Sequence, residues 1–192
     1  QLGRNVMDHH FLVGAQADVD GFEDRYYAGR RPNGIYIPRF RNLGDAGTKG
    51  KDFTRGYGYQ GGASRSGWQR LVAEMGFGKE MKDELQEPGD WSMGITAFGE
   101  MLPNHENKVT IDETKADKWG LPVLAIDCET GENERLMRRD MMNDMAEMLE
   151  AAGVSEVRVY DNISFPGMGI HEMGTARMGR DPKTSVLNAH NQ

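Results

Sequence analysis

Short segments of alternating or mostly apolar side chains recur along the chain of 192 residues and predict β-strands. Pro38 cannot donate to a ladder hydrogen bond, so the strand that contains it is expected at a sheet edge. Gly61 and Gly62 are expected to end another strand. The polar segment 103–107 has the composition of a hairpin turn that pairs the strands on either side of it. The predicted strands are Phe11–Val19, Gly34–Phe40, Phe53–Gln60, Trp91–Leu102, Lys108–Asp112, Leu121–Cys128 and a short one at Val157 and Val159.

Two stretches have the apolar spacing of amphipathic helices. Over residues 64–86 the pattern is helical, but Gly76 and Gly78 are expected to divide the helix in two. The clearer helix follows an N-cap at Asn133 and ends at Gly153. A methionine stripe on one face of a helix is core more often than a plastic binding surface, so we expect the stripe to be buried. Its members are Met137, Met141, Met145 and Met148.

Strands in succession, interrupted by two helices, predict an α+β fold. We expect a mostly antiparallel β-sheet of about five or six strands, with helices packed on one face. No regular period continues from the last strand to Gln192. The length suits one domain with its own hydrophobic core, so a single domain over residues 1–192 is expected.

Composition excludes several functional classes. The net charge is -7 and the basic residues are scattered among acids, which disfavours a nucleic-acid partner. No apolar run approaches the roughly 20 residues that span a bilayer, and the first residues do not resemble a signal peptide. Cys128 is the single cysteine, which excludes an internal disulfide and a cysteine-built metal cluster. We expect a soluble protein, with a cytoplasmic and a periplasmic location both open.

Three motifs invite a functional interpretation and are better explained without one. Gly56–Gly61 matches G-x-G-x-x-G, but the segment before it is not a buried parallel strand and no acidic residue follows a further strand at the usual spacing, so a glycine-rich strand end is favoured. Thr175 stands where a zinc-protease helix beginning at His171 needs its second histidine, so no metal site is expected. Neighbours on a strand point to opposite sides, so His9 and His10 are expected to be a surface or interface pair.

Glycines gather around one histidine in Gly167–Gly179, a stretch without helical or strand period. Such a backbone can fold closely around a ligand and present His171 with few competing side chains. A lone loop histidine is nevertheless more often structural or merely exposed, so spacing alone leaves its function open.

Two separate segments resemble one enzyme family. The run HEMGTARMGRDPKTSVLN, His171–Asn188, closely resembles the C-terminal signature of the glucose-methanol-choline (GMC) flavoprotein oxidoreductases. The run GRNVMDH, Gly3–His9, resembles the segment by which their chain leaves the flavin domain. Leu102–Val109 and Asp117–Pro122 also resemble the substrate-domain hairpin and following strand of that family. The resemblance therefore covers nearly the whole chain.

The resemblance implies that the chain is the substrate-binding or cap region of a larger FAD-dependent alcohol oxidoreductase. The family's FAD-binding turn and its second catalytic His or Asn have no counterpart here, so we expect the FAD-binding domain to be absent and this piece alone to bind no FAD. The implied partners are a sugar or polyol substrate, the missing flavin domain and an electron-transfer subunit. Oxygen, quinone and a cytochrome subunit all stay open as the electron acceptor.

The family pattern also implies roles for individual residues. His171 is expected to be the general base, because a neutral imidazole can take the hydroxyl proton while hydride leaves the carbon. Gln60 resembles the polar strand position that faces the substrate, although a solvent-facing glutamine is about as probable from the residue alone. Gly174, Thr175 and Arg177 are expected to support the active-site loop. The alternative is a stand-alone carbohydrate-binding or subunit-interaction module without catalysis.

Overall fold

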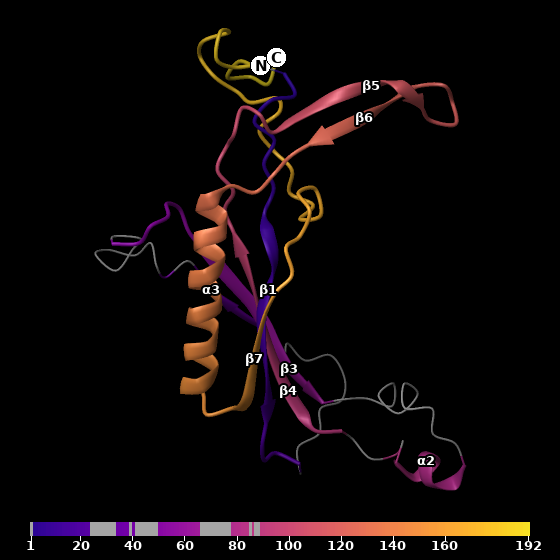
Figure 1. Ribbon diagram of the computed structural model, residues 1–192, viewed down its shortest axis with the longest axis vertical. Coiled ribbons are helices and arrows are strands. Elements are labelled where there is room, and N and C mark those ends of the chain that lie inside the picture. The colour runs from indigo at the N-terminus through magenta and orange to yellow at the C-terminus, as the bar shows by residue number, and fades with distance from the viewer. Residues whose placement is uncertain are drawn as a thin grey trace.

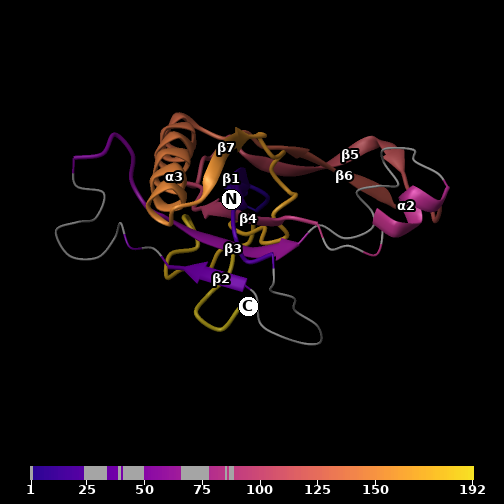
Figure 2. The ribbon, with the colours of Figure 1, turned by 90° about the horizontal axis from the view of Figure 1, so that it is seen from below.

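A computed structural model describes residues 2–23, 34–38, 40, 50–65, 78–84, 86 and 89–192. Its main feature is a five-stranded antiparallel sheet with the strand order β2-β3-β4-β1-β7 (Figure 2). The strands are β1 (His10–Val19), β2 (Gly34–Ile37), β3 (Tyr57–Arg65), β4 (Trp91–Gly99) and β7 (Ser155–Asp161). The strand that precedes Pro38 lies at an edge of this sheet, as predicted.

Helix α3 (Glu132–Ala151) packs along one face of the main sheet, against β1, β7 and β4 (Figure 1). The short helix α2 (Lys79–Glu84) lies apart from α3, at the opposite end of the molecule from a second, two-stranded sheet. That sheet is a ribbon of β5 (Lys108–Ala116) and β6 (Pro122–Asp127), which extends away from the main sheet. The α+β fold with mostly antiparallel strands is thereby confirmed.

The core lies between α3 and the main sheet. Met137, Met141 and Met145 are fully buried, which confirms that the methionine stripe is core. Opposite them, alternate strand residues point toward the helix because successive side chains in a strand face opposite ways. These core residues are Val13, Ala15, Ala17, Tyr57, Tyr59, Ile95 and Ala97.

Helix α3 begins two residues earlier than the sequence predicted. Its N-cap is Gly131, whose N–H donates to the Glu134 carboxylate over 2.7 Å. Asn133 instead accepts a hydrogen bond from the backbone N–H of Thr54. The helix ends as expected before Gly153, which has a left-handed φ of 77°.

Gly61 and Gly62 do not end their strand, contrary to expectation, because β3 continues to Arg65. Gly61 is needed for close strand approach: a Cβ there would lie 2.3 Å from the Gly94 carbonyl oxygen. The predicted helix over residues 64–86 is therefore wrong at its start, and 66–77 of it lies outside the described residues. Its second half corresponds to α2.

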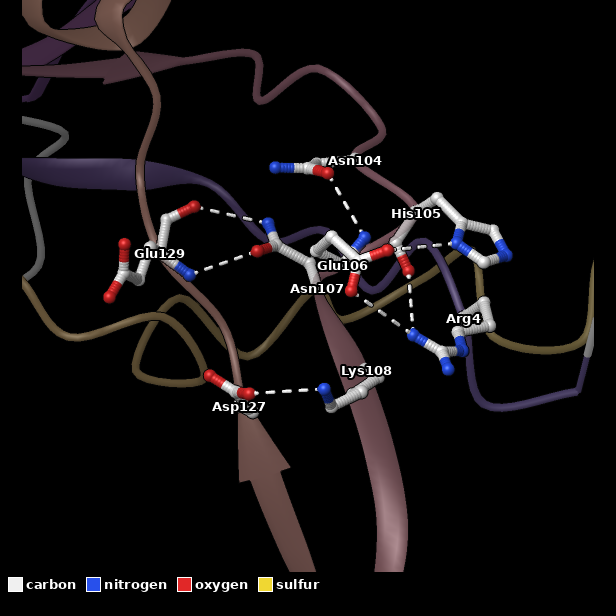
Figure 3. A network of polar contacts seen from close by, with 8 residues as sticks. All are labelled: Arg4, Asn104, His105, Glu106, Asn107, Lys108, Asp127 and Glu129. Carbon is white, nitrogen blue, oxygen red and sulfur yellow. Dashed lines mark hydrogen bonds and ion pairs between the residues drawn. The ribbon is translucent and has the colours of Figure 1, made fainter.

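The predicted hairpin between Trp91–Leu102 and Lys108–Asp112 is also wrong. Strand β4 pairs with β1 and β3, whereas β5 pairs with β6. Segment 103–107 does contain a turn, because the Asn107 N–H donates to the Asn104 carbonyl over 3.0 Å, but this turn forms a crossing from β4 to the ribbon rather than a hairpin. The Asn107 side chain exchanges hydrogen bonds of 3.0 and 3.1 Å with the backbone of Glu129 (Figure 3). Arg4 donates to the His105 carbonyl in the same network. The crossing thus fastens the ribbon to the N-terminal segment.

None of the helices in the described ranges is both long enough and apolar enough to cross a membrane.

Candidate functional site

The face of the main sheet opposite α3 carries a cavity of about 480 Å³. Gln60 is exposed on this face because it follows the buried Tyr59, and successive side chains of a strand point to opposite faces of the sheet. The segment that follows β7 runs along the same side (Figure 1) and closes one wall of the cavity. Polar and apolar side chains line the cavity, among them His9, Tyr36, Gln60, Phe98, Met168 and His171.

The structure brings His171 and Gln60 into the wall of one cavity, although 110 residues separate them in sequence. His171 is exposed and lies on an irregular loop, whereas Gln60 lies on β3, paired with Thr96 of β4. Strand pairing therefore fixes the backbone from which the Gln60 side chain projects, and the loop presents the imidazole. An amide donates to and accepts from hydroxyl groups, and an imidazole can accept a proton, so the cavity has the chemistry to bind and deprotonate an alcohol.

His9 is a second imidazole in this cavity. Its ring lies 5.0 Å from the ring of His171, centroid to centroid, in an edge-on arrangement. Nδ1 of His9 lies 3.2 Å from the Gly99 carbonyl oxygen. A carbonyl only accepts hydrogen bonds, so Nδ1 carries the proton in this contact. The interpretation of His9 and His10 as a surface or interface pair is wrong, because the two side chains lie on opposite faces of the sheet: His9 lines this cavity, whereas His10 is buried toward α3.

His10 lies on the other side of the sheet and is almost fully buried. A register shift between His10 and Val13 places both residues on the face toward α3. Burial, aided by the positive charge of Arg138, lowers the pKa of His10 to about 4. His10 is thus a neutral core residue near pH 7, and the two adjacent histidines have opposite environments.

Gly174 and Thr175 hold the loop of His171 against the N-terminal segment. Gly174 has a φ of 97°, and a Cβ there would lie 2.0 Å from the Asn5 carbonyl oxygen, so the close approach requires glycine. The Thr175 carbonyl accepts from Gly3 over 3.0 Å, and Met7 and Met173 exchange two backbone hydrogen bonds of 2.9 Å. Gly174 and Thr175 are not among the residues that line the His171 cavity. This geometry is consistent with loop support, which stays a prediction.

Arg177 lies further along and organises a different loop. Its Nε donates to the Thr184 carbonyl over 2.8 Å, and its own carbonyl accepts from Val186 and Leu187. It is likewise not among the cavity-lining residues. Arg177 therefore shapes segment 177–187, while His171 and Gln60 are the two predicted site residues that the fold brings together.

The loop beside the cavity exposes several apolar side chains. Phe165 and Ile170 are 78% and 80% exposed, and Met168 is also exposed. Exposed apolar side chains gathered on one loop are typical of surfaces that contact another molecule or domain.

Gly56–Gly61 lies at the start and within β3, and no helix follows it directly. The rejection of this motif as a dinucleotide fingerprint is thereby supported, because that fingerprint works only where a strand leads into a helix.

Comparison with known proteins supports the family resemblance. Residues 103–192 match the family model described as GMC oxidoreductase. This match over the C-terminal part of the chain confirms the family resemblance noted in the sequence.

Two curated relatives extend the match over the rest of the chain. The chain is 29% identical to 2-methyl-1,2-propanediol dehydrogenase of Mycolicibacterium austroafricanum, over all of this chain and 34% of that protein. It is 26% identical to the fructose dehydrogenase large subunit of Gluconobacter japonicus, over 97% of this chain and 33% of that protein. The chain thus spans about a third of the length of the curated relatives it matches.

Proposed function

We propose that this chain is the substrate-binding region of an FAD-dependent oxidoreductase that oxidises a hydroxyl-bearing carbon of a sugar or polyol. One observation carries the proposal: His171 and Gln60 line the same cavity on the open face of the sheet. The names of the two relatives refer to a diol and to a sugar, which supports a substrate with several hydroxyl groups.

The residues around the cavity fit one side of a flavin site. Met168 and Ile170 are exposed apolar side chains at its wall and would border a flat apolar ring. The described residues offer no strand-to-helix glycine turn for the dinucleotide, so the remainder of the FAD site would belong to a flavin domain. Bound there, FAD would supply the acceptor for the substrate hydride.

His171 is the general base of the proposed reaction. Its imidazole takes the proton from the substrate hydroxyl as the hydride leaves the carbon that bears this hydroxyl. Removal of the proton avoids a high-energy protonated carbonyl. Histidine is the side chain that most often serves as a general base in enzymes.

Gln60 orients the substrate. Its amide can accept from one substrate hydroxyl and donate to another, and its backbone is fixed by the pairing of β3 with β4. Tyr36 and Phe98 complete the wall with aromatic surface, which suits the apolar C–H faces of a sugar ring.

The test uses the complete polypeptide of which this chain is part, purified and reconstituted with FAD. Anaerobic bleaching of the flavin by 1,2-diols, linear polyols and ketohexoses is expected, with no bleaching by analogues whose hydroxyls are replaced by hydrogen. Saturable sugar binding without FAD binding or bleaching would instead support the stand-alone carbohydrate-binding module.

A further inference from the structure

The carboxylate of Asp8 gathers backbone N–H groups from the loop that carries His171. It accepts from Gly167 over 3.0 Å, from Gly169 over 2.6 Å and from His171 itself over 3.3 Å. It also accepts from the N–H of His9 over 2.7 Å. Asp8 is only 4% exposed. A nearly buried carboxylate is therefore paired with main-chain donors of one short loop.

This loop has little else to define its shape between Gly167 and His171. It belongs to no helix or strand, and Gly167 and Ile170 have left-handed φ values of 96° and 54°. Such a conformation is costly for Ile170, because its branched Cβ crowds the backbone there. Hydrogen bonds from three alternate residues to one carboxylate can maintain it, since charge-assisted bonds are stronger than neutral ones.

Gly169 shows how closely the loop approaches the carboxylate. A Cβ at this position would lie 2.4 Å from Oδ1 of Asp8, which is far inside van der Waals contact. The glycine therefore lets the N–H of residue 169 reach Asp8, and any larger residue would push the loop away from it.

We infer that Asp8 is a positioning residue for His171: through the backbone of 167–171 it holds the imidazole in the substrate cavity. Asp8 lines a separate groove on the other side of the loop rather than the cavity itself. It acts through His171 without contact with the substrate. This inference rests on the proposed function for its catalytic consequence, whereas the hydrogen bonds of the loop stand independently of that function.

The substitution Asp8→Asn tests this with little change in size. The asparagine amide keeps one acceptor oxygen but has an NH2 group in place of the second oxygen, so it presents a donor to the N–H donors of the loop. Asp181→Asn is the matched control, because the Asp181 carboxylate also accepts a loop N–H, that of Lys183 over 2.9 Å, in the distant 177–187 segment. Gly169→Ala provides a second perturbation that leaves the carboxylate in place.

Two measurements on the complete flavoenzyme separate loop anchoring from catalysis. Amide hydrogen exchange of 167–171 should accelerate in Asp8→Asn and in Gly169→Ala, while β1 keeps its protection. The flavin reduction rate at saturating substrate should fall by about 10- to 100-fold in both, with KM changed far less, because small misplacement of a catalytic group has this effect. The pH dependence of reduction should shift in both, and the double variant should be no slower than the worse single variant.

Parental reduction rates and pH profile in Asp8→Asn, despite faster loop exchange, would overturn the positioning role and leave Asp8 as a loop anchor alone. Unchanged exchange of 167–171 would overturn the anchoring itself. If His171→Ala reduces its flavin normally, the proposed function fails, yet the exchange measurement still reads out the anchoring. Should Asp8→Asn fail to fold, Gly169→Ala alone decides between these outcomes.

Discussion

The two faces of the main sheet are built from the same strands by different means. Toward α3, alternate residues of β1, β3 and β4 are apolar and fully buried against the methionines of the helix. On the open face, most of the intervening positions are small or polar, with Phe98 as a large apolar exception at the cavity, and the irregular segment after β7 is held there mainly through hydrogen bonds of its backbone. One face is stabilised by side-chain packing, and the other is kept available for chemistry. Stability and function should therefore respond to different substitutions.

The largest difference should separate two methionines. Met145 is fully buried on α3, so Met145→Ala should lower the free energy of unfolding by about 2–5 kcal/mol, because it leaves a cavity in the core. Met168 is exposed at the site, and Met168→Ala should change that free energy by less than about 0.5 kcal/mol. Denaturant unfolding of both variants measures this. Equal effects would show that the two faces do not differ as described.

A second difference concerns sensitivity to low pH, because His9 lies at the cavity on the open face whereas the adjacent His10 is buried in the packed face. The folded pKa of His10 is about 4, below the ordinary value of 6.5, because the ring is buried. As pH falls below 6.5 the unfolded chain binds a proton at His10 that the folded chain does not, so stability is lost between pH 6.5 and 4. By pH 5 this loss amounts to about 2 kcal/mol.

The His10→Leu variant should lack this part of the acid sensitivity. Its unfolding free energy, compared with that of the parent from pH 7 to pH 5, measures the contribution before most carboxylates titrate. His190→Leu, which changes an exposed histidine, is the control and should follow the parent. A His10→Leu profile parallel to that of the parent would mean that His10 is not a buried neutral group.

The smallest expected effect lies on the open face. Gln60→Ala should raise KM for the polyhydroxy substrate by about 2- to 13-fold, the value of one ordinary hydrogen bond, with the unfolding transition unchanged. Gln16 is also exposed on the main sheet but is not among the cavity-lining residues, so Gln16→Ala is the matched control. Equal KM values in the two variants would remove Gln60 from the substrate site.

The sequence predicted the packed face better than the open one. Helix α3 and strand β1 follow from apolar periodicity, since each buries one face or stripe. The apolar run of β6 also predicted a strand, although Leu124 and Ile126 are exposed in the structure. The pairing of β4 was missed because segment 103–107 has turn-like composition while Asn107 makes its hydrogen bonds to Glu129, 22 residues away. Local pattern does not encode such long-range pairing.

The candidate site was predictable only in part. His171 could be located by its glycine-rich motif, and Gln60 by its place on a strand. The positions of His9 and Asp8 were not predicted, because they depend on hydrogen bonds to backbone atoms remote in sequence, 90 residues away for His9 and about 160 for Asp8. The partner of His9 is a backbone carbonyl and those of Asp8 are backbone N–H groups, which nearly every residue carries, so these partners leave no residue-type signal. The one available signal was that both lie in Gly3–His9, the second segment of the family resemblance.

The role of His171 as base is tested most directly by stopped-flow reduction of the flavin in the complete enzyme at saturating substrate. His171→Ala should retain FAD with a normal spectrum and reduce it about 10²- to 10⁴-fold more slowly than the parent. His105→Ala, an exposed histidine in the 103–107 crossing, should reduce at the parental rate. A His171→Ala variant that reduces its flavin at close to the parental rate, with no ionisation between about pH 5 and 8 in the parent, would contradict the account and leave His171 as a structural loop residue.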